Sequence, residues 1–380
     1  MGSSSRLADR DWGFRDRRES VPGGFGRAIP GAHDPENPRP DPPAASAVRT
    51  SSIMPVVMKR MPAPLLILLL AVAAVLAVAA SLAFGSSGID SPWERLAAGD
   101  PLMQTIVWEL RLPRALAAFG AGAVLALAGV LMQALLRNPL ADPYVLGVSG
   151  GAAVGALAVM LAGLTGLAVD AGAASGAFAA MLLVFAVAHG PGGWTTTRLL
   201  LTGVVVAAGC GAIISLLLSL SDDLRLRGML FWLLGDFSYV RTPWSLLILA
   251  LAAIPACLLA ARPLDALARG ELQAQLLGVP VRGLRIAIYV AASVLTAAAV
   301  TTAGSIGFVG LVTPHLVRLV IGSSHRAVIP AAALAGGALL VVADLLARTV
   351  AAPRQLPVGA LTALIGVPLF LLLMRRRPAG

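Results

Sequence analysis

Residues 111–156 read RLPRALAAFGAGAVLALAGVLMQALLRNPLADPYVLGVSGGAAVGA, and this stretch decides the fold. Its apolar part, 115–136, carries no charged residue and is long enough to cross the roughly 30 Å hydrocarbon core of a bilayer. Because backbone groups in lipid must be satisfied within the segment, the run predicts a transmembrane α-helix. Gly120, Gly122 and Gly129 permit the close approach of neighbouring helices. We therefore expect this helix at the crowded centre of a bundle.

The rest of the chain is similarly apolar. Of its 380 residues, 58% are hydrophobic and only 13% are charged, whereas water-soluble domains carry about 25% charged residues. The sequence therefore predicts an all-α, polytopic membrane bundle of about ten helices. The predicted spans are 63–84, 113–136, 143–163, 171–188, 198–220, 243–262, 284–303, 307–321, 328–348 and 357–374.

The N-terminal segment has a different composition. Residues 1–57 mix arginines, acids and prolines and hold no long apolar run, so they lack the apolar surface that could offset the entropy of ordering. We expect a disordered tail or an over-extended gene start at 1–57, followed by a transmembrane permease domain at 58–380.

Basic residues are unevenly shared between the two sets of loops. If the N-terminus is cytoplasmic, the cytoplasmic ends and loops hold thirteen basic residues against three acidic ones, and the opposite side holds eight against nine. Cytoplasmic loops of membrane proteins carry an excess of Lys and Arg, so both termini are predicted to be cytoplasmic. The sequence pI of 11.1 follows from this placement and does not indicate nucleic-acid binding.

Two loops are long enough to hold helices of their own. The outer loop, 221–242, mixes aromatic and charged residues and suits an interfacial helix. The inner loop, 263–283, has leucines at helical spacing beside polar residues. Such a helix could seat in a partner's groove or lie on the lipid surface, and the pattern alone leaves both open.

Several kinds of chemistry are missing from the sequence. Lys59 is the only lysine and no glycine precedes it, so the phosphate-binding loop GxxxxGK[ST] is absent. Asp344 is the only carboxylate within the predicted spans, and it lies near one end, whereas proton-driven transporters place carboxylates or histidines inside the membrane. No metal site is expected, because no histidine is predicted at mid-membrane. A proton-coupled secondary transporter or exporter is thus disfavoured but stays open, as does a membrane scaffold.

The opening stretch resembles the second and third spans of the permeases that import iron-siderophores, haem and cobalamin in bacterial ABC systems. Further blocks fit the same FecCD-like family of type II importers and bring the resemblance to essentially all of 63–376. These blocks are RLLLTGVVVAAG (198–209), LFWLLGDFS (230–238), LLGVPVRGLR (276–285) and the run from GSIGFVGLVTPH through ADLLAR to LPVGALTALIGVPLFLLLMRR (304–376). One departure is Gln355, where many members have Glu before LP-[VI]-G.

The resemblance implies a partner set. We expect a homodimer in the bacterial inner membrane, two ATPase subunits that use ATP and Mg, and a periplasmic substrate-binding protein. The chain itself is expected to bind no cofactor and to catalyse no reaction. It would move a metal chelate inward by alternating access, with haem, siderophore and cobalamin all open as cargo.

The resemblance also implies three sets of site residues. Arginines expected to meet the binding protein are Arg111, Arg114 and Arg348, although snorkelling to the membrane surface would explain them too. Residues expected to contact the ATPase are Arg269, Gly270, Glu271, Leu272, Leu276, Leu277 and Gly278. Residues expected at the pathway or its gate are Gly147, Ser149, Gly150, Gly151, Gly190, Thr195, Thr196 and Thr197. For the glycine cluster after Pro143, an ordinary tight turn is the alternative.

Overall fold

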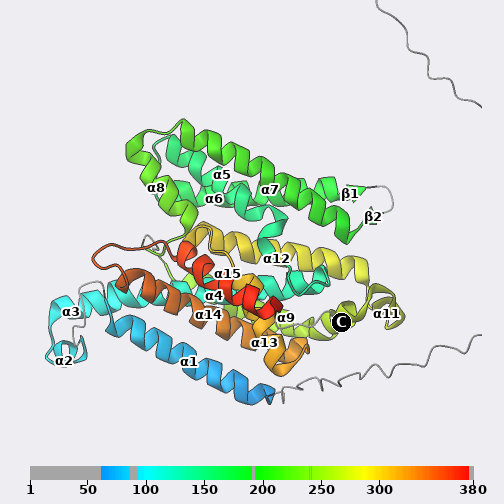
Figure 1. The fold of residues 1–380 in the computed structure, drawn as a ribbon, viewed down its shortest axis with the longest axis horizontal. Coiled ribbons are helices and arrows are strands. Elements are labelled where there is room, and N and C mark those ends of the chain that lie inside the picture. The colour runs from blue at the N-terminus through cyan, green and yellow to red at the C-terminus, as the bar shows by residue number, and fades with distance from the viewer. Residues whose placement is uncertain (1–60, 86–91, 191–192, 239, 241, 376–380) are drawn as a thin grey trace, which may run out of the picture. The chain divides into compact units, whose positions relative to one another are not determined.

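The computed structural model describes residues 61–375 except 86–91, 191–192, 239 and 241. The predicted tail, 1–57, lies outside the described residues. The remainder is almost entirely helical (Figure 1). Its helices are α1 (Ala63–Ala83), α2 (Pro92–Ala97), α3 (Pro101–Thr105), the π-helix η1 (Ile106–Arg111), α4 (Leu112–Leu135), the 3₁₀ turn η2 (Pro143–Leu146), α5 (Val148–Leu161), α6 (Leu167–Ala188), α7 (Thr196–Ser219), α8 (Asp223–Leu234), α9 (Trp244–Leu259), α10 (Ala261–Arg269), α11 (Glu271–Leu276), α12 (Val281–Ala303), α13 (Val309–Ile321), α14 (His325–Thr349) and α15 (Val358–Arg375).

The predicted all-α polytopic bundle is confirmed. Among the described residues, six helices are long and apolar enough to cross a membrane, and the pair α9 and α10, bent by 60°, adds a seventh candidate. Three shorter apolar helices, α5, α13 and α15, complete the ten segments expected from the sequence. The described strands are the two-residue pair β1 (His189–Gly190) and β2 (Gly193–Trp194), which pair antiparallel.

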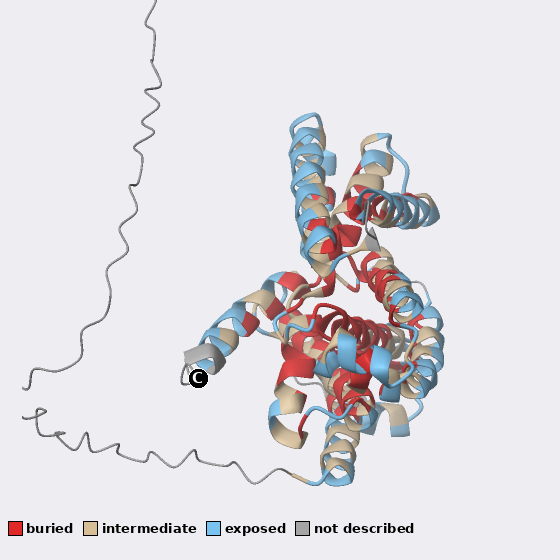
Figure 2. Cartoon of the chain, turned by 90° about the vertical axis from the view of Figure 1, so that its right-hand side faces the viewer, coloured by how far each residue is buried: buried red, intermediate tan, exposed pale blue. Residues whose placement is uncertain are grey.

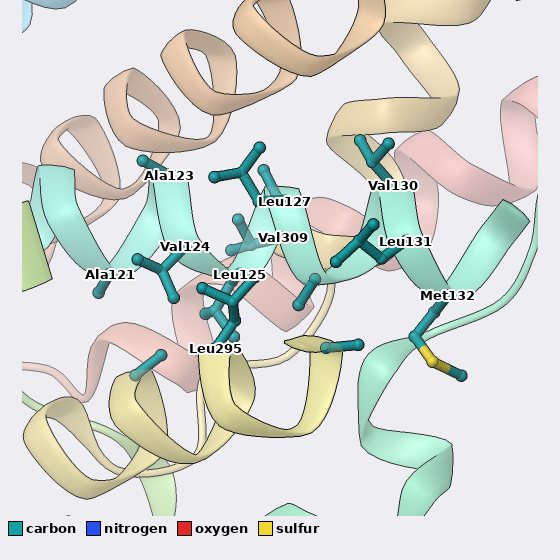
Figure 3. Close-up of a cluster of buried hydrophobic side chains, with 14 of the residues drawn as sticks. Ala121, Ala123, Val124, Leu125, Leu127, Val130, Leu131, Met132, Leu295 and Val309 are labelled. Atoms are coloured by element: carbon teal, nitrogen blue, oxygen red, sulfur yellow. The ribbon is translucent and has the colours of Figure 1, made fainter. Parts of the chain in front are cut away.

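Helix α4 lies at the centre of one group of helices and contacts α9, α12, α13 and α14. Buried residues gather around it (Figure 2), and its Val124 and Leu125 point toward Leu295 of α12, whereas Leu127 and Val130 point to the opposite side (Figure 3). The carbonyl of Gly336 in α14 lies directly over Gly122, and that of Gly310 in α13 lies directly over Gly129. The central position predicted for this span is therefore correct, and the glycines are what allow it.

Helices α5, α6 and α7 form a second group that packs mainly on itself (Figure 1). The backbones of α5 and α6 touch at two glycine pairs, Gly151 with Gly176 and Gly155 with Gly172. Helix α12 contacts both groups, because it packs against α4 on one side and against α5 and α6 on the other. It is therefore the element through which the two groups are joined most extensively.

The second span begins earlier than predicted. α3, η1 and α4 run as one 35-residue helix from Pro101 to Leu135, rather than starting near residue 113. Asp100 accepts hydrogen bonds from the backbone N–H groups of Leu102 and Met103, and Pro101 takes the first helical position, which is a typical helix start. Arg95 donates to the same carboxylate and lowers the pKa of Asp100.

Candidate functional site

The candidate residues gather at the two ends of the bundle. One end carries α2, α3 and α8 and the other carries α11 and the β1–β2 hairpin (Figure 1). We call these the α2/α3 end and the α11 end. The three arginines expected to meet a binding protein lie at the α2/α3 end, and the residues expected to meet an ATPase lie at the α11 end. The structure therefore places these two sets of residues at opposite ends of the bundle, and the side of the membrane that each end faces stays a prediction.

At the α2/α3 end, Arg111 is turned inward. It lies in the π-helical turn η1, is only 7% exposed, and donates hydrogen bonds to the carbonyl oxygens of Leu82 (2.7 Å) and Ala83 (3.2 Å). Its guanidinium closes over Gly85, where a side chain would leave it no room. Arg111 thus fastens the end of α1 to the entry of α4.

Arg114 and Arg348 share a buried carboxylate. Asp344 is fully buried and lies 2.8 Å from Nη2 of Arg114 and 3.1 Å from Nε of Arg348. Arg114 also forms an ion pair with Asp236 (3.3 Å), and Arg348 donates to the hydroxyl of Ser81 (2.7 Å). Charge-assisted bonds of this kind are about twice as strong as neutral ones. They draw α4, α14 and the segment after α8 together.

The same arginines line a cavity of about 590 Å³. Other charged or polar residues in its lining are Arg95, Glu109, Ser238 and Gln355. The side-chain oxygen of Gln355, at the position where the family often has Glu, accepts hydrogen bonds from Arg114 (3.3 Å) and Ser238 (2.9 Å). The arginines are therefore brought together as expected, but their described contacts are intramolecular, and their docking role stays a prediction.

At the α11 end, the inner loop forms two short helices rather than one. Gly270 has φ of 141°, a conformation that L side chains rarely adopt, and it separates α10 from α11. Three leucines project from this segment into open space: Leu272 is 70% exposed, Leu276 79% and Leu277 68%. Arg269, at the end of α10, is also exposed, and Gly278 ends the segment with φ of 77°. The segment presents apolar side chains that the described chain leaves uncovered.

The base of this segment is firmly held. Leu264 and Leu267 of α10 are buried, and Asp265 binds both the backbone N–H (2.9 Å) and the ring Nδ1 (2.6 Å) of His325 in α14. Glu271 opens α11 and forms ion pairs with Arg137, beyond the end of α4, and with Arg285 of α12. The exposed leucines are thus carried on a rigid support.

The glycine cluster after Pro143 lies in helix contacts. Gly147 has φ of 74° and begins α5, and Gly150 faces Cys210 of α7. Gly151 packs on α6, as described above, and the hydroxyl of Ser149 lies 3.1 Å from that of Ser305. The described contacts thus explain these residues by packing within the subunit. A place along the pathway stays a prediction.

The predicted gate region is the short link between α6 and α7. Gly190 pairs with Gly193 in the hairpin, and the Thr195 hydroxyl caps α7 by accepting from the N–H of Arg198 (3.3 Å). The Thr196 hydroxyl accepts a hydrogen bond from Arg285 (3.1 Å), and Thr197 is exposed. The structure therefore brings this link close to α12, which the sequence did not predict.

The sequence also did not predict the partners of the three arginines. Asp344 stands four residues before Arg348, a spacing that places two helical side chains on one face and could have indicated the pair. Asp236 and Ser81 have no such signal, because they lie in other elements far along the chain. Nor does the sequence indicate that the side chain of Arg285, at the start of a predicted span, reaches three different elements.

Comparison with known proteins agrees with this geometry. The FecCD transport family matches residues 61–376. The hemin transport system permease protein HmuU of Yersinia pestis is 42% identical over 281 residues, which cover 71% of this chain and 84% of that protein. The vitamin B12 import system permease protein BtuC of Citrobacter koseri is 42% identical over 318 residues, which cover 81% of this chain and 94% of that protein.

A solved structure is similar over nearly the whole bundle. It is described as an inward-facing conformation of a metal-chelate type ABC transporter, and it matches with a TM-score of 0.75 and 32% identity. The match covers 83% of this chain and 100% of the other. The resemblance found in the sequence blocks is thereby confirmed, and the chain belongs to the FecCD transport family.

Proposed function

We propose that this chain is the permease subunit of an ATP-binding-cassette importer in the bacterial inner membrane. It moves a metal chelate from periplasm to cytoplasm by alternating access, and separate subunits hydrolyse the ATP with Mg. Similarity to permeases named for hemin and vitamin B12 supports a large metal chelate as the cargo. The assembly consists of two copies of this chain, two ATPase subunits and a periplasmic binding protein, with both termini of the chain cytoplasmic.

The observation that carries this proposal is the α10–α11 segment. A soluble ATPase needs a rigid, partly apolar element on which to bind, since binding costs less when the partner is already ordered. Helix α11 meets this need, because its leucines are uncovered while its base is held by ion pairs. An amphipathic helix that seats in a groove is a recurrent mode of protein recognition.

The cavity at the α2/α3 end supports contact with the binding protein. Arg111, Arg114 and Arg348 are part of its lining, and Arg114 keeps 12% of its side chain exposed although it pairs with Asp236 and Asp344. Complementary charge at such a surface mainly sets orientation and the rate of association. A symmetric dimer would present this end twice, once from each copy of the chain. Acidic residues on each of the two lobes of a binding protein would then meet one copy.

Reconstituted transport tests the proposal. The permease is placed in liposomes with a candidate ATPase and a candidate binding protein, and hemin, cobalamin or a ferric siderophore is added outside. We expect uptake of one chelate that requires ATP and all three components and that resists a protonophore. Uptake driven by a proton gradient without the ATPase would instead indicate a secondary transporter, and no uptake with any component would favour the scaffold.

Replacing an exposed leucine of α11 with a charged residue should weaken the binding of the ATPase to the permease. We expect Leu276→Glu to weaken ATPase association at least about tenfold, the effect of losing one well-packed contact residue at an interface. The fold should survive, because Leu276 is 79% exposed. Co-purification and surface binding measure the association. Leu224→Glu is the matched control: it makes the same change at a residue that is 95% exposed on α8, at the other end, and should leave ATPase binding intact.

A further inference from the structure

Arg285 joins the segment proposed to bind the ATPase to the link between α6 and α7. It lies near the start of α12, and its side chain is 14% exposed. One guanidinium nitrogen contacts the carboxylate of Glu271 in α11 and the hydroxyl of Thr196 (3.1 Å), and the other donates to the carbonyl oxygen of Trp194 (3.3 Å). A single planar group thus holds three elements that are distant in sequence.

Trp194, in the described part of the link, is packed tightly on α12 and α6. The ring of Trp194 lies edge-on to Tyr289, with 4.9 Å between ring centroids, and 5.2 Å from the ring of Phe185 in α6. Tyr289 is fully buried one turn after Arg285, and its hydroxyl donates to the carbonyl of Met181 (2.7 Å). Movement of α11 relative to α12 would therefore be resisted by Arg285, and movement of Arg285 would act directly on the first residues of α7.

Glu271 has a second partner that allows the two connections to be compared. Arg137, beyond the end of α4, lies 3.2 Å from Glu271 and is 42% exposed, so water screens this pair more than the pair with Arg285. Arg137 leads back to the central helix, whereas Arg285 leads to the link before α7. The better shielded of the two connections is the one that reaches the predicted gate.

We infer that Arg285 is a positioning residue that transmits displacement of the α10–α11 segment to the α6–α7 link. The inference rests on the proposed function, which places the ATPase on that segment. Arginine suits the role because its five donors lie in one plane and can satisfy a carboxylate, a carbonyl and a hydroxyl together. Lysine keeps the charge, but its compact ammonium cannot span the same three groups.

The test separates ATP hydrolysis from transport and from movement of the link. In the reconstituted complex, Arg285→Gln should lower chelate uptake per ATP hydrolysed about tenfold, the effect of losing one charge-assisted hydrogen bond. The ATPase rate should stay near that of the wild type. Arg285→Lys should give an uptake per ATP hydrolysed between that of the wild type and that of Arg285→Gln. Movement is followed by thiol labelling of Thr197→Cys in a variant that carries Cys210→Ala and Cys257→Ala; we expect ATP to change the labelling rate, and Arg285→Gln to abolish that change.

Matched variants decide between a relay and a merely structural role. Arg282→Gln removes the same charge from an exposed residue three positions earlier on α12 and should change neither uptake nor labelling. Glu271→Gln combined with Arg285→Gln should lose clearly less than the sum of the two single losses, because both variants break the same ion pair between Glu271 and Arg285. An ATP-dependent labelling change that persists in Arg285→Gln, or additive losses, would overturn the inference. A wild-type complex without ATP-driven uptake would count against the proposed function instead.

Discussion

Asp344→Ala is expected to destabilise the permease by about 3–5 kcal/mol, the range found when one partner of a buried ion pair is removed. Asp344 is fully buried, and the side chains of Arg114 and Arg348 that it neutralises are only 12% and 6% exposed. Two guanidinium groups would then lie in a poorly solvated site with too little negative charge. Unfolding of the purified protein in detergent, followed by heat or by denaturant, measures the loss.

Two further variants define the cause. Asp222→Ala removes an exposed aspartate at the start of α8 that makes no side-chain cap hydrogen bond, and it should change stability by no more than about 0.5 kcal/mol. Adding Arg348→Met to Asp344→Ala should restore part of the lost stability, because one unpaired charge is removed with its partner. Losses that simply add would show that Asp344 and Arg348 act independently.

Gly129→Val should prevent the central helix from packing, with a cost of at least about 3 kcal/mol, the upper range for overfilling a close-packed core. A Cβ atom at this position would lie 1.9 Å from the Gly310 carbonyl oxygen, far closer than van der Waals contact allows. Backbone cannot move aside as a flexible side chain can, so α4 and α13 must separate. The yield of monodisperse protein and its thermal unfolding in detergent report the effect.

The control is a helical glycine in open space. At Gly283, in the first turn of α12, an added methyl group would meet no atom of the described residues within 4 Å, so Gly283→Ala should be neutral or slightly stabilising. Gly122→Val should repeat the defect of Gly129→Val, because its Cβ would meet the carbonyl of Gly336. Normal folding of both valine variants would mean that the helices of this bundle are not held in close backbone contact.

Hydropathy predicted the spans well because each helix must satisfy its backbone inside lipid, and this requirement is local in sequence. It could not predict which helices are central. An 18-residue stretch of the helix that contains α4 and one of α7 have almost equal mean hydropathy, 2.2 and 2.3, yet 89% of the first stretch and 11% of the second is buried in the described structure. Both helices contain three glycines, and only their contacts differ: Gly122 and Gly129 of α4 meet the backbones of α14 and α13, whereas Gly209 and Gly211 of α7 would meet no atom within 4 Å.

The sequence predicted which residues belong to the candidate sites, but it did not predict the contacts that these residues make with one another. Exposed leucines at helical spacing identified α11, and the break at Gly270 changed only the number of helices. The partners of the arginines escaped prediction because contacts such as Arg114 with Asp344 join residues 230 positions apart. Such pairs depend on how helices are arranged around α4, which a single sequence does not specify.

The 35-residue helix from Pro101 to Leu135 has a consequence for where a partner can rest. From Trp108, whose exposed ring suits the headgroup level, to Leu135 the helix rises about 40 Å, close to the full thickness of a bilayer with its headgroups. The helical residues before Trp108, 101–107, must then project beyond the lipid headgroups into water. A protein that docks on α2 and α3 is then held about 10 Å above the headgroups.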